Sequence, residues 1–158
     1  MNNTDIPVAV GHIPSGLFIV AVDHNGQKDG YLASWVQQVS FKPLLVSFTI
    51  KSDRPGYEAI KSGSVFTINI VGEHESQYLR HFWSGYAPGQ SPFNQIEHTT
   101  TSNGGLVING AKSAIDCKFV SISKPGDHEV VVAEVIGSTI NNQEAKPKVH
   151  IRKSGLDY

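Results

Sequence analysis

A turn that follows an apolar strand carries residues suited to binding a phosphate. The apolar run Leu44 to Ile50 ends in Lys51-Ser52-Asp53-Arg54. Lys51, Ser52 and Arg54 combine positive charge with hydrogen-bond donors, which phosphate oxygens accept. These residue types therefore predict an anion site, and a solvated turn with an ordinary N-cap is the alternative that they leave open.

A short helix is expected directly after this turn, over Tyr57 to Ser62. Pro55 would stand near its first position and Gly63 just past its end, the positions these residues favour. The unpaired N–H groups of a helix start would add to the anion site.

His128 is a second candidate for chemistry. It follows Gly126-Asp127 at the mouth of an expected strand, Glu129 to Ile136, where a side chain can point at a ligand. A turn histidine bonded to the backbone or to Asp127 is the competing interpretation, because imidazole serves either role.

Other chemistries have weaker support. The seven histidines form no His-Glu-x-x-His pattern, so we expect no metal site, although His74 and His81 could share a helix face. Cys117 lies in an alternating apolar strand and is expected to be a small buried hydrophobe. No serine stands in a Gly-x-Ser-x-Gly elbow, and Asn103-Gly104-Gly105 fits a hairpin turn better than a dinucleotide loop.

The elements that must position these residues are mostly strands. Alternation and β-branched residues predict the strands, Asn25-Gly26 predicts a tight hairpin, and the spacing of Tyr78, Leu79 and Phe82 predicts a helix between Glu73 and Trp83. Ser84 to Gln95 reads as a long loop. The expected strands are 16–22, 31–39, 44–50, 64–71 (half-buried), 106–108, 114–122 and 129–136.

Short strands with two brief helices favour a closed or partly closed barrel, and thus a mainly β fold. A small barrel is filled by its own side chains, so a large ligand must bind at its mouth or outer surface. We find no domain boundary and expect a single domain over residues 1–158.

Composition excludes several function classes. The chain has 158 residues with 39% hydrophobic residues, which is enough for a core without disulfides. The net charge is −1, so we expect neither nucleic acid nor an anionic membrane as a partner. One cysteine and no long apolar run lead us to expect a cytoplasmic protein without a membrane segment.

Several runs of residues form a set with a characteristic order and spacing, namely Ala33-Ser34-Trp35, Ser40-Phe41-Lys42-Pro43, Lys51-Ser52-Asp53-Arg54, 65–71, Pro125-Gly126-Asp127-His128 and 152–158. This set resembles the flavin reductase-like family of FMN-binding split barrels. The resemblance covers residues 8 to 158, and the Ser34-Trp35 pair is most similar to flavin reductase modules of flavodiiron-type flavoproteins. Pro43-Leu44 and Trp35 differ from the residues usual in free-standing reductases.

The resemblance implies a role for each of these sites. It implies that backbone groups of Leu32, Ala33, Ser34 and Trp35, with the Ser40 hydroxyl, bind the flavin ring and ribityl chain, with Trp35 beside the ring. It implies further that the turn Lys51-Ser52-Asp53-Arg54 holds the phosphate and that His128 helps to place the nicotinamide for hydride transfer.

The resemblance also implies an activity and an assembly. It implies a homodimer with FMN at the interface, NAD(P)H as co-substrate and an electron acceptor that could be a protein. An FMN electron carrier without efficient NAD(P)H oxidation and a cofactor-free binding module remain as alternatives.

Overall fold

The computed structural model describes residues 5–83, 85–87 and 89–157, so residues 84 and 88 of the expected loop and Tyr158 lie outside the described part. Short strands dominate, as predicted. The elements are α1 (Ile6–Gly11), β1 (Ser15–Gly16), β2 (Phe18–His24), β3 (Gln27–Ala33), β4 (Val36–Ser40), β5 (Leu45–Ile50), α2 (Tyr57–Lys61), β6 (Phe66–Ile70), α3 (Arg80–Trp83), the 3₁₀ helix η2 (Pro92–Asn94), β7 (His98–Thr100), β8 (Leu106–Ile108), β9 (Ser113–Ser123), β10 (Glu129–Ile140) and β11 (Val149–His150).

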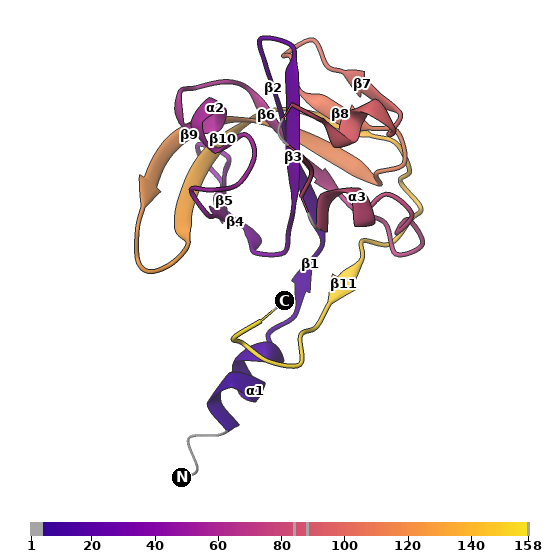
Figure 1. The fold of residues 1–158 in the computed structure, drawn as a ribbon. Helices are drawn as coiled ribbons and strands as arrows, with labels where there is room; N and C mark the ends of the chain where they lie inside the picture. The colour runs from indigo at the N-terminus through magenta and orange to yellow at the C-terminus, as the bar shows by residue number, and fades with distance from the viewer. Residues whose placement is uncertain (1–4, 84, 88, 158) are drawn as a thin grey trace.

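Within the described residues, seven strands form an antiparallel sheet in the order β3-β2-β6-β9-β10-β5-β4 (Figure 1). Its two edge strands, β3 and β4, are consecutive in the chain and are separated only by Ser34 and Trp35. The prediction of one strand over 31–39 was therefore wrong. The chain leaves one edge of the sheet at Ala33, opposite Phe18, and joins the other edge at Val36, opposite Phe48.

The sheet curls until these edges approach each other. The Tyr31 hydroxyl of β3 donates to the Thr49 carbonyl of β5 at 3.2 Å, which bridges the split. Two register shifts between β9 and β10 add the bends that such closure requires. The predicted tight hairpin is confirmed, since Asn25 and Gly26 both have positive φ, 55° and 86°.

The core forms two clusters, one on each side of the sheet. Val20 and Val22 of β2 pack inside the barrel, while Ile19 and Ala21 of the same strand pack on the outside against α3, η2 and β8. Alternate residues of a strand point to opposite faces, so β2 is buried on both.

Strand β6 corrects a prediction, because it is not half-buried. Phe66 and Ile68 face the barrel interior, while Thr67 and Asn69 on the other face are equally inaccessible. Asn69 is satisfied there: its side-chain amide donates to the carbonyls of Ile19 and Leu106, and its oxygen accepts the amide of Ile108. The polar residues that indicated a solvent face are thus bonded inside the protein: Asn69 attaches β8 to the sheet, and Thr67 donates to Asp116 of β9.

The helix expected between Glu73 and Trp83 is formed only over its last turn, α3. The backbone before it is used elsewhere, since the Glu73 amide donates to the carbonyl of Lys146. The apolar spacing nevertheless identified buried residues correctly, because Tyr78 and Phe82 belong to the outer core cluster.

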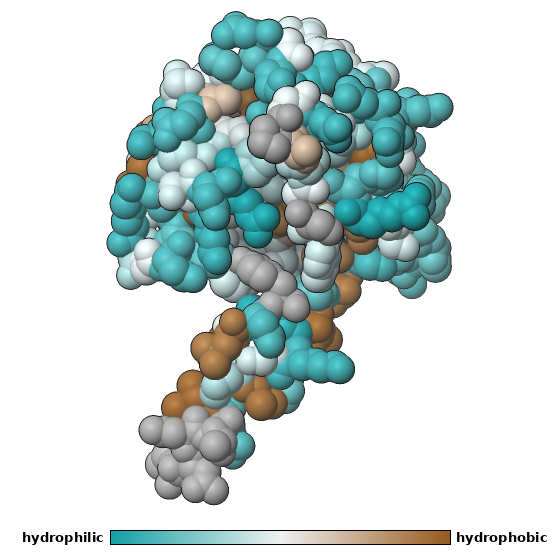
Figure 2. Space-filling model, viewed as in Figure 1, coloured by the Kyte–Doolittle hydropathy of each residue, from teal (hydrophilic) through white to brown (hydrophobic). Residues whose placement is uncertain are grey.

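An arm built from α1, β1, β11 and the residues up to 157 projects away from the barrel (Figure 1). Its surface is unusually apolar, as the brown side chains of Figure 2 show. None of the described helices is long and apolar enough to cross a membrane. The exposed large hydrophobic residues on the arm are Ile6, Val8, Val10, Ile13, Val149, Ile151 and Leu156.

The buried carboxylate of Glu129 should make the stability of the fold depend on pH. Lys124 and Tyr57 both donate to Glu129, each at 2.6 Å, and together they hold its pKa below the ordinary 4.5. A group with a lowered folded pKa contributes stability above its unfolded pKa and loses that contribution as pH falls through the folded value. Glu129→Gln should therefore flatten the loss of stability below about pH 4.5.

Urea unfolding at a series of pH values between about 7 and 3 measures this effect. Glu134→Gln is the matched control, because Glu134 is exposed on the same strand. An acid limb of the same steepness in Glu129→Gln and wild type would contradict the assignment.

Candidate active site

One cleft opens where the two edges of the sheet meet, and it collects most of the predicted site. It encloses about 720 Å³, a volume that includes space open to solvent. It brings together seven of the ten predicted residues, namely Leu32, Ala33, Ser34, Trp35, Lys51, Arg54 and His128.

Strand register explains why residues so far apart in sequence meet there. The Thr49 amide of β5 donates to the Trp35 carbonyl at 3.2 Å, which places Trp35 beside the end of β5. Glu129 of β10 lies opposite Ile50 of β5, so His128 and Lys51 follow as neighbours on adjacent strands. The indole of Trp35, the ammonium group of Lys51 and the imidazole of His128 therefore lie at the ends of three neighbouring strands, on the same side of the barrel.

His128 is packed against Trp35 and Asp127. The rings of His128 and Trp35 are 5.0 Å apart in an edge-to-face arrangement, and Nδ1 of His128 lies 3.1 Å from Oδ1 of Asp127. The His128 side chain lowers the pKa of Asp127 by hydrogen bonding and by charge. His128 therefore has the expected turn contact and also lines the cleft, so the two interpretations are compatible.

Ser34 supplies a polar atom that points to a ligand. Its Oγ is buried in the cleft wall and has no hydrogen-bond partner among the described residues. Buried hydroxyl groups in proteins nearly always have a partner, since an unpaired one costs about 1–3 kcal/mol. A polar ligand in the cleft would remove this cost.

The predicted anion site would rest on side chains and not on the start of the helix. Helix α2 begins after Gly56, whose φ is 80°, so Pro55 precedes the N-cap instead of occupying the first turn. A side chain at this glycine would also collide with Val22. Lys51 and Arg54 are half-buried and line the cleft, whereas Ser52 and Asp53 are exposed and lie outside it.

Ser40 does not line the cleft. It ends β4, opposite Leu45, five residues beyond Trp35. Its predicted contact with the flavin stays a prediction.

Several cleft residues were not predicted from the sequence. Thr49 and Ile50 line the cleft at the end of β5, and the half-exposed Trp83 lies on α3. His150 comes from the arm through the pairing of β11 with β1. Burial, and then the charges of Arg152 and Lys148, lower the pKa of His150, which favours the neutral imidazole.

Within the described part of the chain, no arrangement of side chains supports the alternative chemistries. No three histidine, cysteine or acidic residues there are grouped to hold a metal ion. The expected shared face of His74 and His81 does not form, because α3 begins at Arg80. Cys117 is fully buried and burial raises its pKa to about 12, so it is the inert thiol that was predicted.

The chain belongs to the family of flavin reductase like domains, whose sequence profile matches residues 10–155. The predicted resemblance is thereby confirmed.

Two relatives with similar sequences are much longer than this chain. Diflavin flavoprotein A 1 of Synechocystis sp. is 31% identical over 157 residues, which are 99% of this chain and 27% of that protein. A diflavin flavoprotein of Nostoc sp. is 34% identical over 155 residues, 98% of this chain and again 27% of the relative. The chain thus spans only part of the length of these relatives.

Solved structures share the fold. The NADH:FAD oxidoreductase SgcE6 of Streptomyces globisporus superposes with a TM-score of 0.82 at 22% identity, covering 94% of this chain and 87% of that one. The flavin reductase HpaC, solved in complex with NADP+, gives 0.79 at 21% identity, covering 92% and 90%. These likenesses establish the fold and confirm the predicted mainly β split barrel.

Proposed function

We propose that the chain is an FMN-binding, NAD(P)H-dependent flavin oxidoreductase domain. The observation that carries this proposal is the cleft at the split, where two cationic side chains, an orphaned buried hydroxyl and an imidazole converge. The neighbouring cleft beside α2 shares Arg54 but has neither Ser34 nor His128 in its lining.

The residues present fit such a flavin. Lys51 and Arg54 would hold the terminal phosphate, and the buried Oγ of Ser34 would gain the partner that it lacks. Trp35 and His128 would form the wall against which the nicotinamide is placed. FMN, when bound, supplies the redox chemistry by taking up a hydride from the nicotinamide, and the protein supplies position and charge.

Spectroscopy tests the proposal directly. The purified protein, or the protein titrated with flavin, should show the visible absorption bands of a bound flavin. FMN should bind more tightly than riboflavin, and FAD titrated in parallel decides between the two flavin nucleotides. NADH and NADPH should then reduce the bound flavin without oxygen. A protein that ignores all three flavins would instead be a cofactor-free binding module.

We propose that the electron acceptor is a protein. Diflavin flavoproteins, as their name states, carry two flavins, and the segment that matches this chain is only 27% of each relative. A second redox centre, in a partner or in a further domain, is therefore the natural destination of the electrons in this proposal.

We propose a homodimer whose interface includes the apolar arm. Monomeric proteins rarely expose a contiguous apolar patch of this kind, and Ile13, Val149 and Ile151 are each more than 60% exposed on it. A second copy of the chain would cover these residues and could also complete the open side of the cleft.

Light scattering should give about 34 kDa, twice the chain mass of 17.2 kDa. Ile151→Asp should shift the protein toward the monomer, because it would bury a charge in the interface. Ile140→Asp is the control, since Ile140 is 65% exposed, close to the 62% of Ile151, but lies on β10 and off the arm. A wild-type monomer at micromolar concentration with FMN bound would refute this assembly.

A further inference from the structure

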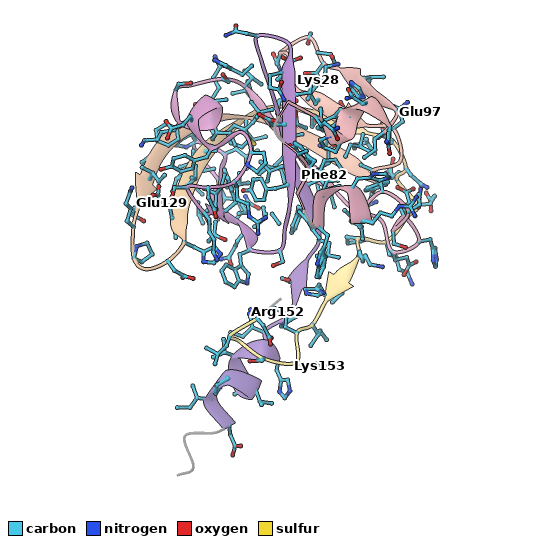
Figure 3. The ribbon with its side chains drawn as sticks, viewed as in Figure 1. Lys28, Phe82, Glu97, Glu129, Arg152 and Lys153 are labelled. Carbon is cyan, nitrogen blue, oxygen red and sulfur yellow. The ribbon has the colours of Figure 1, made fainter. Side chains whose placement is uncertain are left out.

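A charged residue of the arm is buried although its neighbours in the chain are exposed. Arg152 is 8% exposed, whereas Ile151 is 62% exposed and Lys153 is fully on the surface (Figure 3). Arginine is almost never buried without specific contacts. What Arg152 contacts is therefore informative about the role of the arm.

Arg152 reaches from the arm to the cleft wall. Its guanidinium lies over the indole ring of Trp35, with Cζ 5.1 Å from the ring centroid, which is within the range of a cation–π contact. Its Nη1 donates to the Asp157 carbonyl at 3.4 Å, and its backbone amide donates to the Gly11 carbonyl of α1 at 3.2 Å. These bonds attach Arg152 to both parts of the arm.

The contact between Arg152 and Trp35 extends through Trp35 to His128 in the cleft. Trp35 meets Arg152 through its ring face and meets His128 edge-to-face at 5.0 Å, with an interplanar angle of 65°. Trp35 stands in the two-residue connection between β3 and β4, and its carbonyl accepts the Thr49 amide of β5. This bond places its backbone, and Arg152 packs on its side chain from the side of the arm.

We propose that Arg152 is a positioning residue, which holds the Trp35 ring in the rotamer that keeps His128 directed at the reaction site. The role rests on the proposed function, because it concerns the placement of the nicotinamide against the flavin. It also makes the arm part of the active site: the segment that presents the apolar interface carries the group that fixes Trp35.

Lysine at position 152 would keep the cation over the ring, whereas alanine would remove it. Without the cation Trp35 would populate other rotamers and His128 would lose its edge contact. We expect flavin reduction in Arg152→Ala to slow about tenfold, since small displacements of reacting groups are costly. FMN affinity should stay within about twofold, because the phosphate contacts of Lys51 and Arg54 remain.

The first measurement needs no flavin. The chain has two tryptophans, so Trp83→Phe leaves Trp35 as the only reporter. In this background Arg152→Ala should shift the fluorescence emission of Trp35 to the red and increase its quenching by acrylamide. Arg152→Lys and the control Lys153→Ala should resemble the parent. An unchanged Trp35 signal in Arg152→Ala would overturn the contact.

The second measurement is anaerobic stopped-flow reduction of the FMN-loaded variants with Trp83 intact. Slow reduction in Arg152→Ala, with recovery in Arg152→Lys and normal rates in Lys153→Ala, would support the positioning role. If Arg152 were merely structural, Arg152→Ala would lower the melting temperature and leave the reduction rate of the folded protein unchanged. That result would overturn the positioning role. If wild type itself neither bound nor reduced FMN, the proposed function would fall first, and the Trp35 signal would still report the contact.

Discussion

Arg54→Ala is expected to weaken FMN binding by about 1.5–3 kcal/mol, which is a rise in Kd of roughly 10- to 160-fold. Arg54 is half-buried in the cleft wall together with Lys51, so a phosphate there would be only partly screened by solvent. Helix α2 begins only after Gly56, too far along the chain for its N-terminus to add positive charge to this site. The side chains of Lys51 and Arg54 must therefore supply that charge. Fluorescence or absorbance titration of the flavin measures the effect.

The comparison with riboflavin makes this experiment specific. Riboflavin lacks the phosphate, so its affinity should be nearly equal in wild type and Arg54→Ala. The loss of FMN affinity should also shrink as salt is added. Arg80→Ala is the matched control, because Arg80 is exposed on α3 and does not line the cleft. Equal FMN affinity in wild type and Arg54→Ala would remove Arg54 from the phosphate site.

His128→Ala should slow the reduction of bound flavin by NAD(P)H about 100-fold and leave FMN affinity nearly intact. The side chain lines the cleft beside Trp35 and is held by Asp127, whereas the proposed phosphate contacts lie on the turn after β5. Loss of the imidazole would therefore misplace the hydride donor without releasing the flavin. Anaerobic stopped-flow at the visible flavin band gives the rate.

Two further variants separate the chemistry of His128 from its packing. His128→Phe keeps an aromatic ring against Trp35 but has no ring nitrogen, so a rate as low as that of His128→Ala would assign the effect to the imidazole nitrogens. His74→Ala is the control, because His74 is exposed and remote from the cleft. Unchanged rates in His128→Ala would end its proposed role. Negligible reduction in wild type would favour an electron carrier.

Local sequence was sufficient to predict the structure around a residue wherever that structure depends on its near neighbours in the chain. Alternation placed β5 and β9, and Asn25-Gly26 fixed the first hairpin, because period and turn preference are properties of a few adjacent residues. The same holds for Cys117, whose alternating apolar neighbours indicated its burial. Lys51 and Arg54 were recognisable because an exposed strand end presents cations together.

The sequence by itself therefore determined most of the strands, the first hairpin turn and half of the side chains that line the cleft, seven of 14. Only the tertiary structure decided that β6 is buried on both faces, since Asn69 and Thr67 satisfy partners from distant strands. Likewise, the break at Ser34 exists because the barrel splits there, and Arg152 reaches Trp35 because β11 pairs with β1. These outcomes depend on which strands pair, and pairing is a long-range property that no window of neighbouring residues contains.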